Sequence, residues 1–279
     1  MSVIHNIVYK KQLDVSKLDK FVSTIDGATY ENRGEDVLYF WIAGKSTRGF
    51  DITFEQGYIE VRNTILSNKH DYDLTNKIVA EILSLTDGIV IDEDEEQISN
   101  FPLFDNDRIA EMEIHDCKTI QLLSKEHEDI AIYGPIRIVH FGKRLHQQFH
   151  ELNEEQLKDK MFNLILDVNY KLPNFEYGNI MQIGDTDEDK KTLKLLTNKA
   201  DYIIDKYDYI LINKGEDEQP PIMITNAILN TMLPSNWTLV DEFTVVAPMT
   251  TENEWNKLLT TAEKYDLTEE FFNDRNASR

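Results

Sequence analysis

The sequence predicts an α+β fold in which mostly antiparallel sheets are packed by helices. Apolar residues recur at helical spacing in three segments, and other segments alternate apolar and polar residues as half-buried strands do. The helices are too few to supply the crossovers that a parallel sheet requires. The composition, 41% hydrophobic and 29% charged, is typical of a chain that buries a packed core.

The length of 279 residues fits two similar-sized α+β domains, which we predict over residues 1–150 and 151–279. The boundary is placed at Glu151, where a polar segment opens a long helical pattern. That segment is not rich in glycine or serine, so we do not expect a flexible linker between the halves.

Three helices are predicted, near residues 71–86, 153–170 and 251–265. Each has an apolar stripe at the spacing of one helix face. Asn153 and Thr251 stand at N-cap positions, and glutamates follow each of them in the first turn, where carboxylates complement the helix dipole. Caps and stripes therefore agree on where these helices begin.

Strands are predicted where apolar runs or alternation are bounded by turn residues. The expected strands cover residues 37–43, 50–54, 59–61, 130–133, 136–141, 209–212 and 237–247. Gly57 lies between the second and third of these, so we expect a β-hairpin there. The segment 107–123 is ambiguous, because its acids alternate with apolar residues as in a strand while Ile109 and Ile120 fit a helix face.

The net charge is the strongest functional signal. The chain has 51 acidic and 29 basic residues, a formal charge of −22, which disfavours binding to nucleic acid or to an anionic membrane. Half of the excess, −11, lies between Glu81 and Asp116, where Arg108 is the one base among twelve acids. Such a field attracts a basic protein and speeds its association.

The densest part of that segment is the predicted partner-binding run, Asp92, Glu93, Asp94, Glu95 and Glu96. The alternative is that this run is a solvated loop whose charge only keeps the protein soluble.

Other features predict a cytoplasmic protein. No run of about 18 apolar residues exists for a membrane span, and His5 and Asn6 interrupt the N-terminal apolar residues, unlike a signal peptide. The single cysteine, Cys117, excludes an intramolecular disulfide and suits a reducing compartment.

Two phosphate or metal motifs are incomplete. Residues 44–47, Gly-Lys-Ser-Thr, match the end of a P-loop, but Tyr39 replaces the required glycine and a strand is expected to follow. The alternating aspartates within 185–189 resemble the start of a calcium loop, yet Lys190 and Leu196 occupy its glycine and glutamate positions. We therefore predict no cofactor.

The histidines supply the alternative hypothesis of an enzyme. His146 and His150 are four residues apart, but Gln147 replaces the glutamate of the zinc-protease pattern, so no metal is predicted. An enzyme of unknown reaction would place its site around His140, His146 and Glu151, the best candidates for acid–base chemistry.

Part of the chain resembles an uncharacterised bacterial domain-of-unknown-function family. The residues concerned are Tyr39–Phe50, Tyr58–Arg62 and Asp71–Leu74, and the resemblance covers residues 37–95. Some small acidic proteins of this kind resemble immunity proteins. The resemblance implies a bacterial cytoplasmic protein and carries over no functional residue. We accordingly predict an acidic protein–protein interaction module, with an immunity or inhibitor protein against a basic toxin or nuclease as the specific hypothesis.

Overall fold

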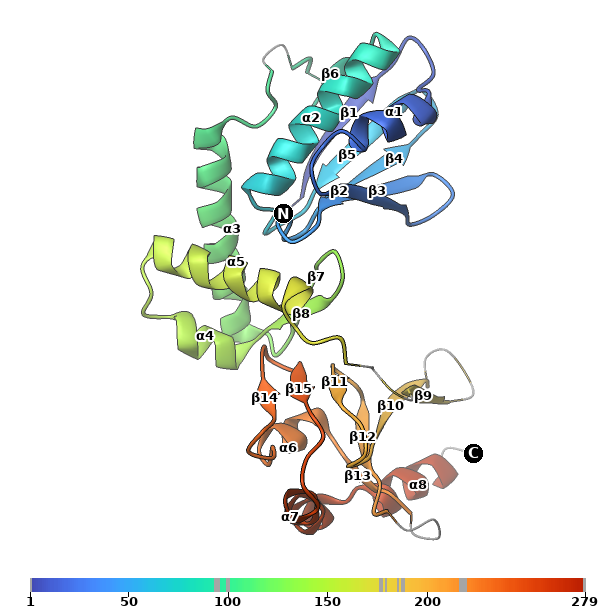
Figure 1. The fold of residues 1–279 in the computed structure, drawn as a ribbon, viewed down its shortest axis with the longest axis vertical. Helices are drawn as coiled ribbons and strands as arrows, with labels where there is room; N and C mark the ends of the chain where they lie inside the picture. Colours follow the sequence, from blue (N-terminus) through green and yellow to red (C-terminus); the bar gives the residue numbers. More distant parts are fainter. Residues whose placement is uncertain are drawn as a thin grey trace. The chain divides into compact units, whose positions relative to one another are not determined.

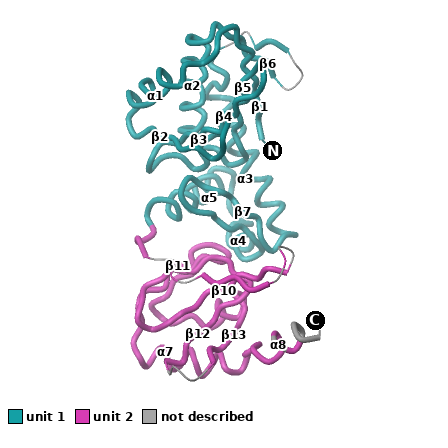
Figure 2. Tube along the Cα trace, turned by 90° about the vertical axis from the view of Figure 1, so that its right-hand side faces the viewer, with its two compact units in different colours: residues 1–171 teal, residues 172–279 magenta. Residues whose placement is uncertain are grey.

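The computed structural model describes residues 2–92, 96–98, 101–175, 178, 180–184, 186, 189–215 and 220–277. The chain forms two compact units, Met1–Lys171 and Leu172–Arg279, which Figure 2 colours teal and magenta. Both combine helices with mostly antiparallel strands, which confirms the α+β class. None of the helices in the described part of the chain is long and apolar enough to cross a membrane.

The first unit begins with a six-stranded antiparallel sheet in the order β2-β3-β4-β5-β1-β6. Its strands are β1 (Val3–Val8), β2 (Ala28–Asn32), β3 (Val37–Ile42), β4 (Phe50–Phe54), β5 (Tyr58–Asn63) and β6 (Ile89–Ile91). Helices α1 (Val15–Val22) and α2 (Lys69–Thr86) cover one face of this sheet (Figure 1). Alternate strand residues such as Phe40 and Ile52 pack against the helices, since successive side chains point to opposite faces.

The rest of the first unit is a helical layer with one hairpin. It comprises α3 (Asn106–Glu126), β7 (Ile130–Tyr133), β8 (Ile138–Phe141), α4 (Lys143–Phe149) and α5 (Glu154–Tyr170). Helix α3 packs on α4 and α5, while β7 pairs with β8. The ambiguous segment 107–123 is therefore helical. Its buried residues, Ile109, Cys117 and Ile120, recur at helical spacing.

The second unit has a four-stranded sheet in the order β13-β12-β10-β9 and a three-stranded sheet in the order β11-β15-β14. Its elements are β9 (Ile180–Ile183), β10 (Lys191–Leu196), β11 (Tyr202–Ile204), β12 (Tyr209–Ile212), β13 (Ile222–Ile224), α6 (Asn226–Asn230), β14 (Thr238–Leu239), β15 (Val245–Ala247), α7 (Glu252–Ala262), the short 3-10 helix η1 (Glu263–Tyr265) and α8 (Thr268–Ala277). Within the described ranges, β10 and β12 form the one parallel pair. Residues from both sheets, including Leu196 and Val245, share one core with α7.

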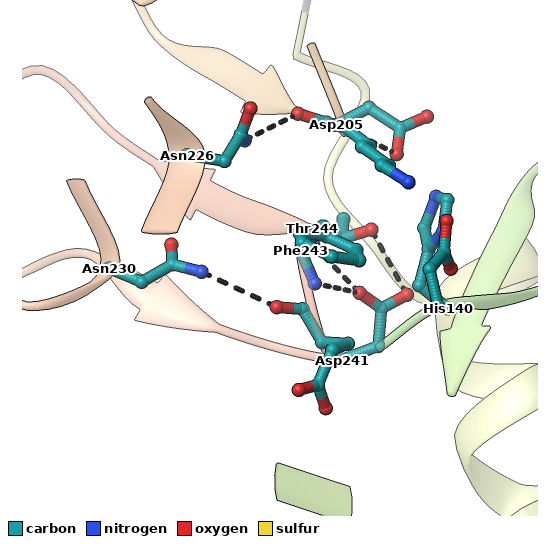
Figure 3. Close-up of polar contacts among 10 residues, drawn as sticks. His140, Asp205, Asn226, Asn230, Asp241, Phe243 and Thr244 are labelled. Atoms are coloured by element: carbon teal, nitrogen blue, oxygen red, sulfur yellow. Dashed lines mark hydrogen bonds and ion pairs between the residues drawn. The ribbon is translucent and has the colours of Figure 1, made fainter. Parts of the chain in front are cut away.

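The predicted strand 237–247 is wrong, because the structure has a hairpin there. The side chain of Asp241 accepts hydrogen bonds from the backbone nitrogens of Phe243 (3.0 Å) and Thr244 (2.7 Å) and from the Thr244 hydroxyl (3.0 Å), as Figure 3 shows. Such a side chain fixes a turn, so the chain reverses between β14 and β15. In the same view, Asn226 and Asn230 donate to the carbonyls of Asp205 and Glu242.

The division of the chain also differs from the predicted boundary at 150/151. Helix α5 lies wholly in the first unit, and its end is tied there by side chains. Asn169 accepts from the backbone nitrogens of Ile136 and Arg137, both at 2.9 Å, and the Tyr170 hydroxyl donates to the Ser46 carbonyl. These bonds hold the C-terminal end of α5 against other residues of the first unit. The boundary between the units therefore lies after α5 and not at the polar segment that precedes this helix.

Candidate functional site

The acidic segment from Glu81 to Asp116 comprises the end of α2, the edge strand β6 and the first half of α3. Two residues of the predicted partner-binding run, Asp92 and Glu96, are described. The Asp92 carboxylate accepts the backbone N–H of Glu96 at 2.9 Å, beside a bridge between Ile91 and Gln97. Glu93, Asp94 and Glu95 lie outside the described residues. The ends of the run thus stand at the edge of the first sheet.

Several acids of this segment bind the chain's own backbone. Asp116 is buried and accepts the N–H of Leu66 at 2.9 Å, and burial raises the pKa of its carboxyl. Glu113 accepts the N–H of Lys69 at 2.7 Å, and Asp105 is the N-cap of α3. These carboxylates accept backbone N–H groups of the same chain. Fewer negative charges are therefore available to a partner than the number of acidic residues in the segment suggests.

The outward side of α3 carries two further acids of this segment, Asp107 and Glu111, on a single stripe. We call this stripe the α3 face, and it consists of Asp107, Glu111, His115, Lys118 and Leu122, all of them exposed. Their spacing of three and four residues places them on the same side of the helix. Asp107 and Glu111 have no ion pair among the described residues, and Leu122 is 67% exposed. The α3 face therefore presents two carboxylates that have no ion pair in the described part of the chain, then His115 and Lys118, which pairs with Glu154, and then an apolar end.

The histidines of the enzyme hypothesis have different partners, and the rings of His146 and His150 stack with their centroids 6.4 Å apart. His140 is buried, and its Nδ1 lies 2.8 Å from an oxygen of Asp129. The Nδ1 of His146 instead bonds a main-chain carbonyl of α3, while the exposed His150 lies 3.6 Å from Glu151. Across the described parts of the chain, no group of three metal-ligating side chains is present.

The Gly44–Thr47 segment is a turn that leads into a strand, as predicted, and not into the helix that a P-loop needs. Both Ser46 and Thr47 are buried, and their hydroxyls bond the protein itself. Of the three aspartates in the second rejected motif, Asp189 is described and accepts the Thr186 hydroxyl at 2.9 Å, whereas Asp185 and Asp187 lie outside the described residues.

Asp71 anchors this turn to the start of α2, a role that the sequence reading missed. Its fully buried carboxylate accepts the Thr47 hydroxyl (3.0 Å) and the backbone N–H groups of Arg48 (3.0 Å), Gly49 (2.9 Å) and Asn68 (3.0 Å). An available signal was its position three residues after Asn68, because the two form a capping box. The four donors make Asp71 a structural carboxylate.

Cys117 is expected to react with a thiol reagent only after unfolding. Its side chain is fully buried, and burial raises the pKa of the thiol to about 12, so almost no thiolate exists at neutral pH. Labelling with 5,5′-dithiobis(2-nitrobenzoate) should be slow in buffer and rapid in denaturant. Equal rates in the two conditions would contradict this burial.

The second unit contains a cavity of about 410 Å³. Its lining combines polar and apolar residues, which are Asn174, Phe175, Gly178, Leu195, Thr197, Ala200, Asp201 and Tyr202. None of the candidate residues predicted from the sequence lies in this lining. The available signal was in β10, where alternation puts Lys194 on the same face as the core residue Leu196.

Comparison with known proteins finds one family. The sequence model of Domain of unknown function (DUF4299) matches residues 2–170, which widens the expected resemblance over 37–95 to nearly the whole first unit. No curated protein and no solved structure is significantly similar to the chain.

Proposed function

The chain belongs to the DUF4299 family of unknown function, and we propose that it is a protein-binding module whose first unit engages a basic partner protein. The observation that carries the proposal is the α3 face, where Asp107 and Glu111 are exposed and have no ion pair among the described residues. Unpaired carboxylates on a rigid helix are available to basic side chains of another protein.

The distribution of charge supports a localised binding surface. Residues 1–171 contain 31 acids and 19 bases. Outside the segment from Glu81 to Asp116, the same unit has 19 acids and 18 bases and is therefore almost neutral. Negative charge that serves only solubility does not need to be clustered in one segment. A clustered negative charge, in contrast, orients a basic protein as it approaches.

The partner class follows from charge and apolar exposure together. Leu122 and Leu123 are 67% and 41% exposed near the end of α3, so the helix that carries the acids also presents an apolar area that a partner can bury. A nuclease or nuclease toxin has a basic cleft for nucleic acid. Filling such a cleft with the α3 face would make the chain an inhibitor or immunity protein.

Neutralising the α3 face is expected to abolish capture of the partner. The variant Asp107→Asn/Glu111→Gln keeps the side-chain shapes and removes two charges, and Glu35→Gln/Glu55→Gln removes two exposed charges elsewhere in the same unit as a matched control. All three proteins serve as baits in the cytoplasm of the native host. A stoichiometric basic protein should bind wild type and control only. Identical capture by all three would reject the proposal.

Association with the captured protein is also expected to slow as salt rises. Screening shortens electrostatic attraction to about 10 Å at 0.1 M salt. Stopped-flow rates should fall about tenfold or more between low and high salt. The Glu35→Gln/Glu55→Gln control should show the same salt dependence as the wild type. Replacing Asp92, Glu93, Glu95 and Glu96 by Asn or Gln tests in the same way whether the predicted run contributes. An unchanged rate for that variant would restrict the interface to α3.

A further inference from the structure

The six-stranded sheet of the first unit has two different edges. At one edge, β6 is covered by residues 96–98 of the same chain. There the Ile98 N–H donates to the Val90 carbonyl at 2.9 Å, and Ile91 forms a bridge with Gln97. At the other edge, β3 is the one strand in the described part of the chain that pairs with β2. An uncovered edge strand presents backbone donors and acceptors with which another strand can pair.

The hydrogen bonds around β2 show which of its backbone groups point outward. The Arg33 N–H donates to the Val37 carbonyl at 3.0 Å, and the Ala43 N–H donates to the Gly27 carbonyl at 2.9 Å. Residues of an antiparallel strand alternate between bonding one neighbour and the other, so the odd-numbered residues here bond β3. The even-numbered residues turn their N–H and C=O groups outward, and these are Ala28, Tyr30 and Asn32.

These outward groups are available for pairing. The Ala28 N–H has an acceptor in its own chain, the Ile25 carbonyl at 3.0 Å. The N–H groups of Tyr30 and Asn32 have no protein acceptor in the described ranges. We propose that this edge binds a second copy of the chain, with the two β2 strands antiparallel and Tyr30 on the two-fold axis.

This register pairs the whole of β2. Each Tyr30 exchanges its N–H and C=O bonds with Tyr30 of the second copy. The Asn32 N–H of each copy donates to the Ala28 carbonyl of the other, and this carbonyl is free to accept because only the Ala28 N–H is used within the chain. The sheet then continues from one copy into the next, so neither copy has an open edge at β2.

The charges of β2 favour a second copy in this register. Glu31 lies opposite Thr29 of the second copy, and its carboxylate already has a cation in its own chain, because Arg33 Nε lies 3.1 Å from it. A register centred on Glu31 would place two carboxylates directly opposite each other, which is destabilising. A register centred on Thr29 would pair Glu31 with Gly27, which lies outside β2 and has a φ of +73°.

The acidic segment does not oppose this association. In the sheet order, β2 and β6 lie at opposite edges, and the described ends of the acidic run, Asp92 and Glu96, adjoin β6. Strands about 4.8 Å apart put about 24 Å between the two edges of each copy. Screening reduces electrostatic repulsion over about 8 Å at physiological salt. The remainder of the first unit is almost neutral, with 19 acids and 18 bases.

The test is the dimer dissociation constant of the full chain, measured by sedimentation velocity over a concentration series. Thr29→Glu and Thr29→Lys form a matched pair, because each puts a long charged side chain at the same half-exposed position. Wild type should dimerise reversibly. Thr29→Glu places like charges opposite each other at two symmetric positions, whereas Thr29→Lys places opposite charges there. The dissociation constant should therefore be about tenfold or more higher for Thr29→Glu than for Thr29→Lys.

Cysteine cross-linking tests the register independently of affinity. Residues 29 and 31 of the two copies form a pair without mutual hydrogen bonds, so their Cα atoms lie about 4.5 Å apart, within reach of a disulfide. Thr29→Cys/Glu31→Cys should therefore form covalent dimers on mild oxidation, whereas neither single variant should. The native Cys117 is buried and should not contribute.

The other outcomes overturn the proposal. A wild type that stays monomeric up to its solubility limit would show that the edge does not bind a second copy. Equal dissociation constants for Thr29→Glu and Thr29→Lys would place the dimer contact away from β2. Efficient cross-linking of either single cysteine variant, or none of the double variant, would exclude the register centred on Tyr30.

Discussion

Replacing Asp71 by alanine is expected to destabilise the first unit by about 3–5 kcal/mol, a large part of the stability of a domain of this size. The substitution leaves the N–H groups of Arg48, Gly49 and Asn68 without their acceptor, whereas the Thr47 hydroxyl keeps the Leu66 carbonyl at 2.7 Å. Hydrogen bonds to a charged group contribute about 1.5–3 kcal/mol each, and buried donors left unpaired add a desolvation cost. The start of α2 and the turn before β4 should therefore loosen together.

Urea denaturation measures this loss, and hydrogen exchange of the α2 and β4 amides assigns it to the first unit. Asp73→Ala is the matched control on the same helix. Asp73 is half-exposed and forms an ion pair with Lys69 at 3.0 Å, so its removal should cost less than about 1 kcal/mol. Similar effects of the two substitutions would show that Asp71 does not anchor the turn. Asp71→Asn tests the charge separately, because its NH₂ group faces the same donors.

Local patterns were sufficient to predict the main helices. The helix at 153–170 begins at Asn153, whose side chain accepts the Gln156 N–H at 3.0 Å in a capping box, and the predicted hairpin turns at Gly57 with a φ of +96°. These features depend on residues a few positions apart, so sequence spacing encodes them directly. The eight-residue helix α1 was missed because it is too short for a repeated stripe.

Long-range pairing and burial could not be predicted in the same way. Strand β1 lies between β5 and β6, an order set by packing of the whole sheet and not by any local signal. The acidic run is visible as composition, but sequence does not show that Asp116 and Glu113 bind backbone donors while Asp107 faces solvent. Burial of Lys194 likewise depends on Gly178 and Tyr202, which come from other segments.

Replacing the buried Lys194 by methionine is expected to stabilise the protein by about 3 kcal/mol at pH 7. Lowering the pKa of the ammonium from 10.5 to about 8 corresponds to about 1.4 kcal/mol per unit, and methionine fills a similar volume without charge. The gain in unfolding free energy should be largest at low pH and should decrease as pH rises. Below pH 8, both folded and unfolded chains carry the proton and the penalty is complete.

Between pH 8 and 10.5, the unfolded chain binds more protons at Lys194 than the folded chain, so the wild type gains stability as pH rises. Above about pH 10.5, both forms are neutral and the penalty is gone. The difference in unfolding free energy between Lys194→Met and wild type should therefore shrink from about 3 kcal/mol at pH 7 towards zero near pH 11. Lys199→Met, at an exposed position, should differ little from wild type at either pH. Urea denaturation of all three proteins at both pH values measures these unfolding free energies. If the difference between Lys194→Met and wild type does not change with pH, the ammonium of Lys194 is not destabilised by burial in the core.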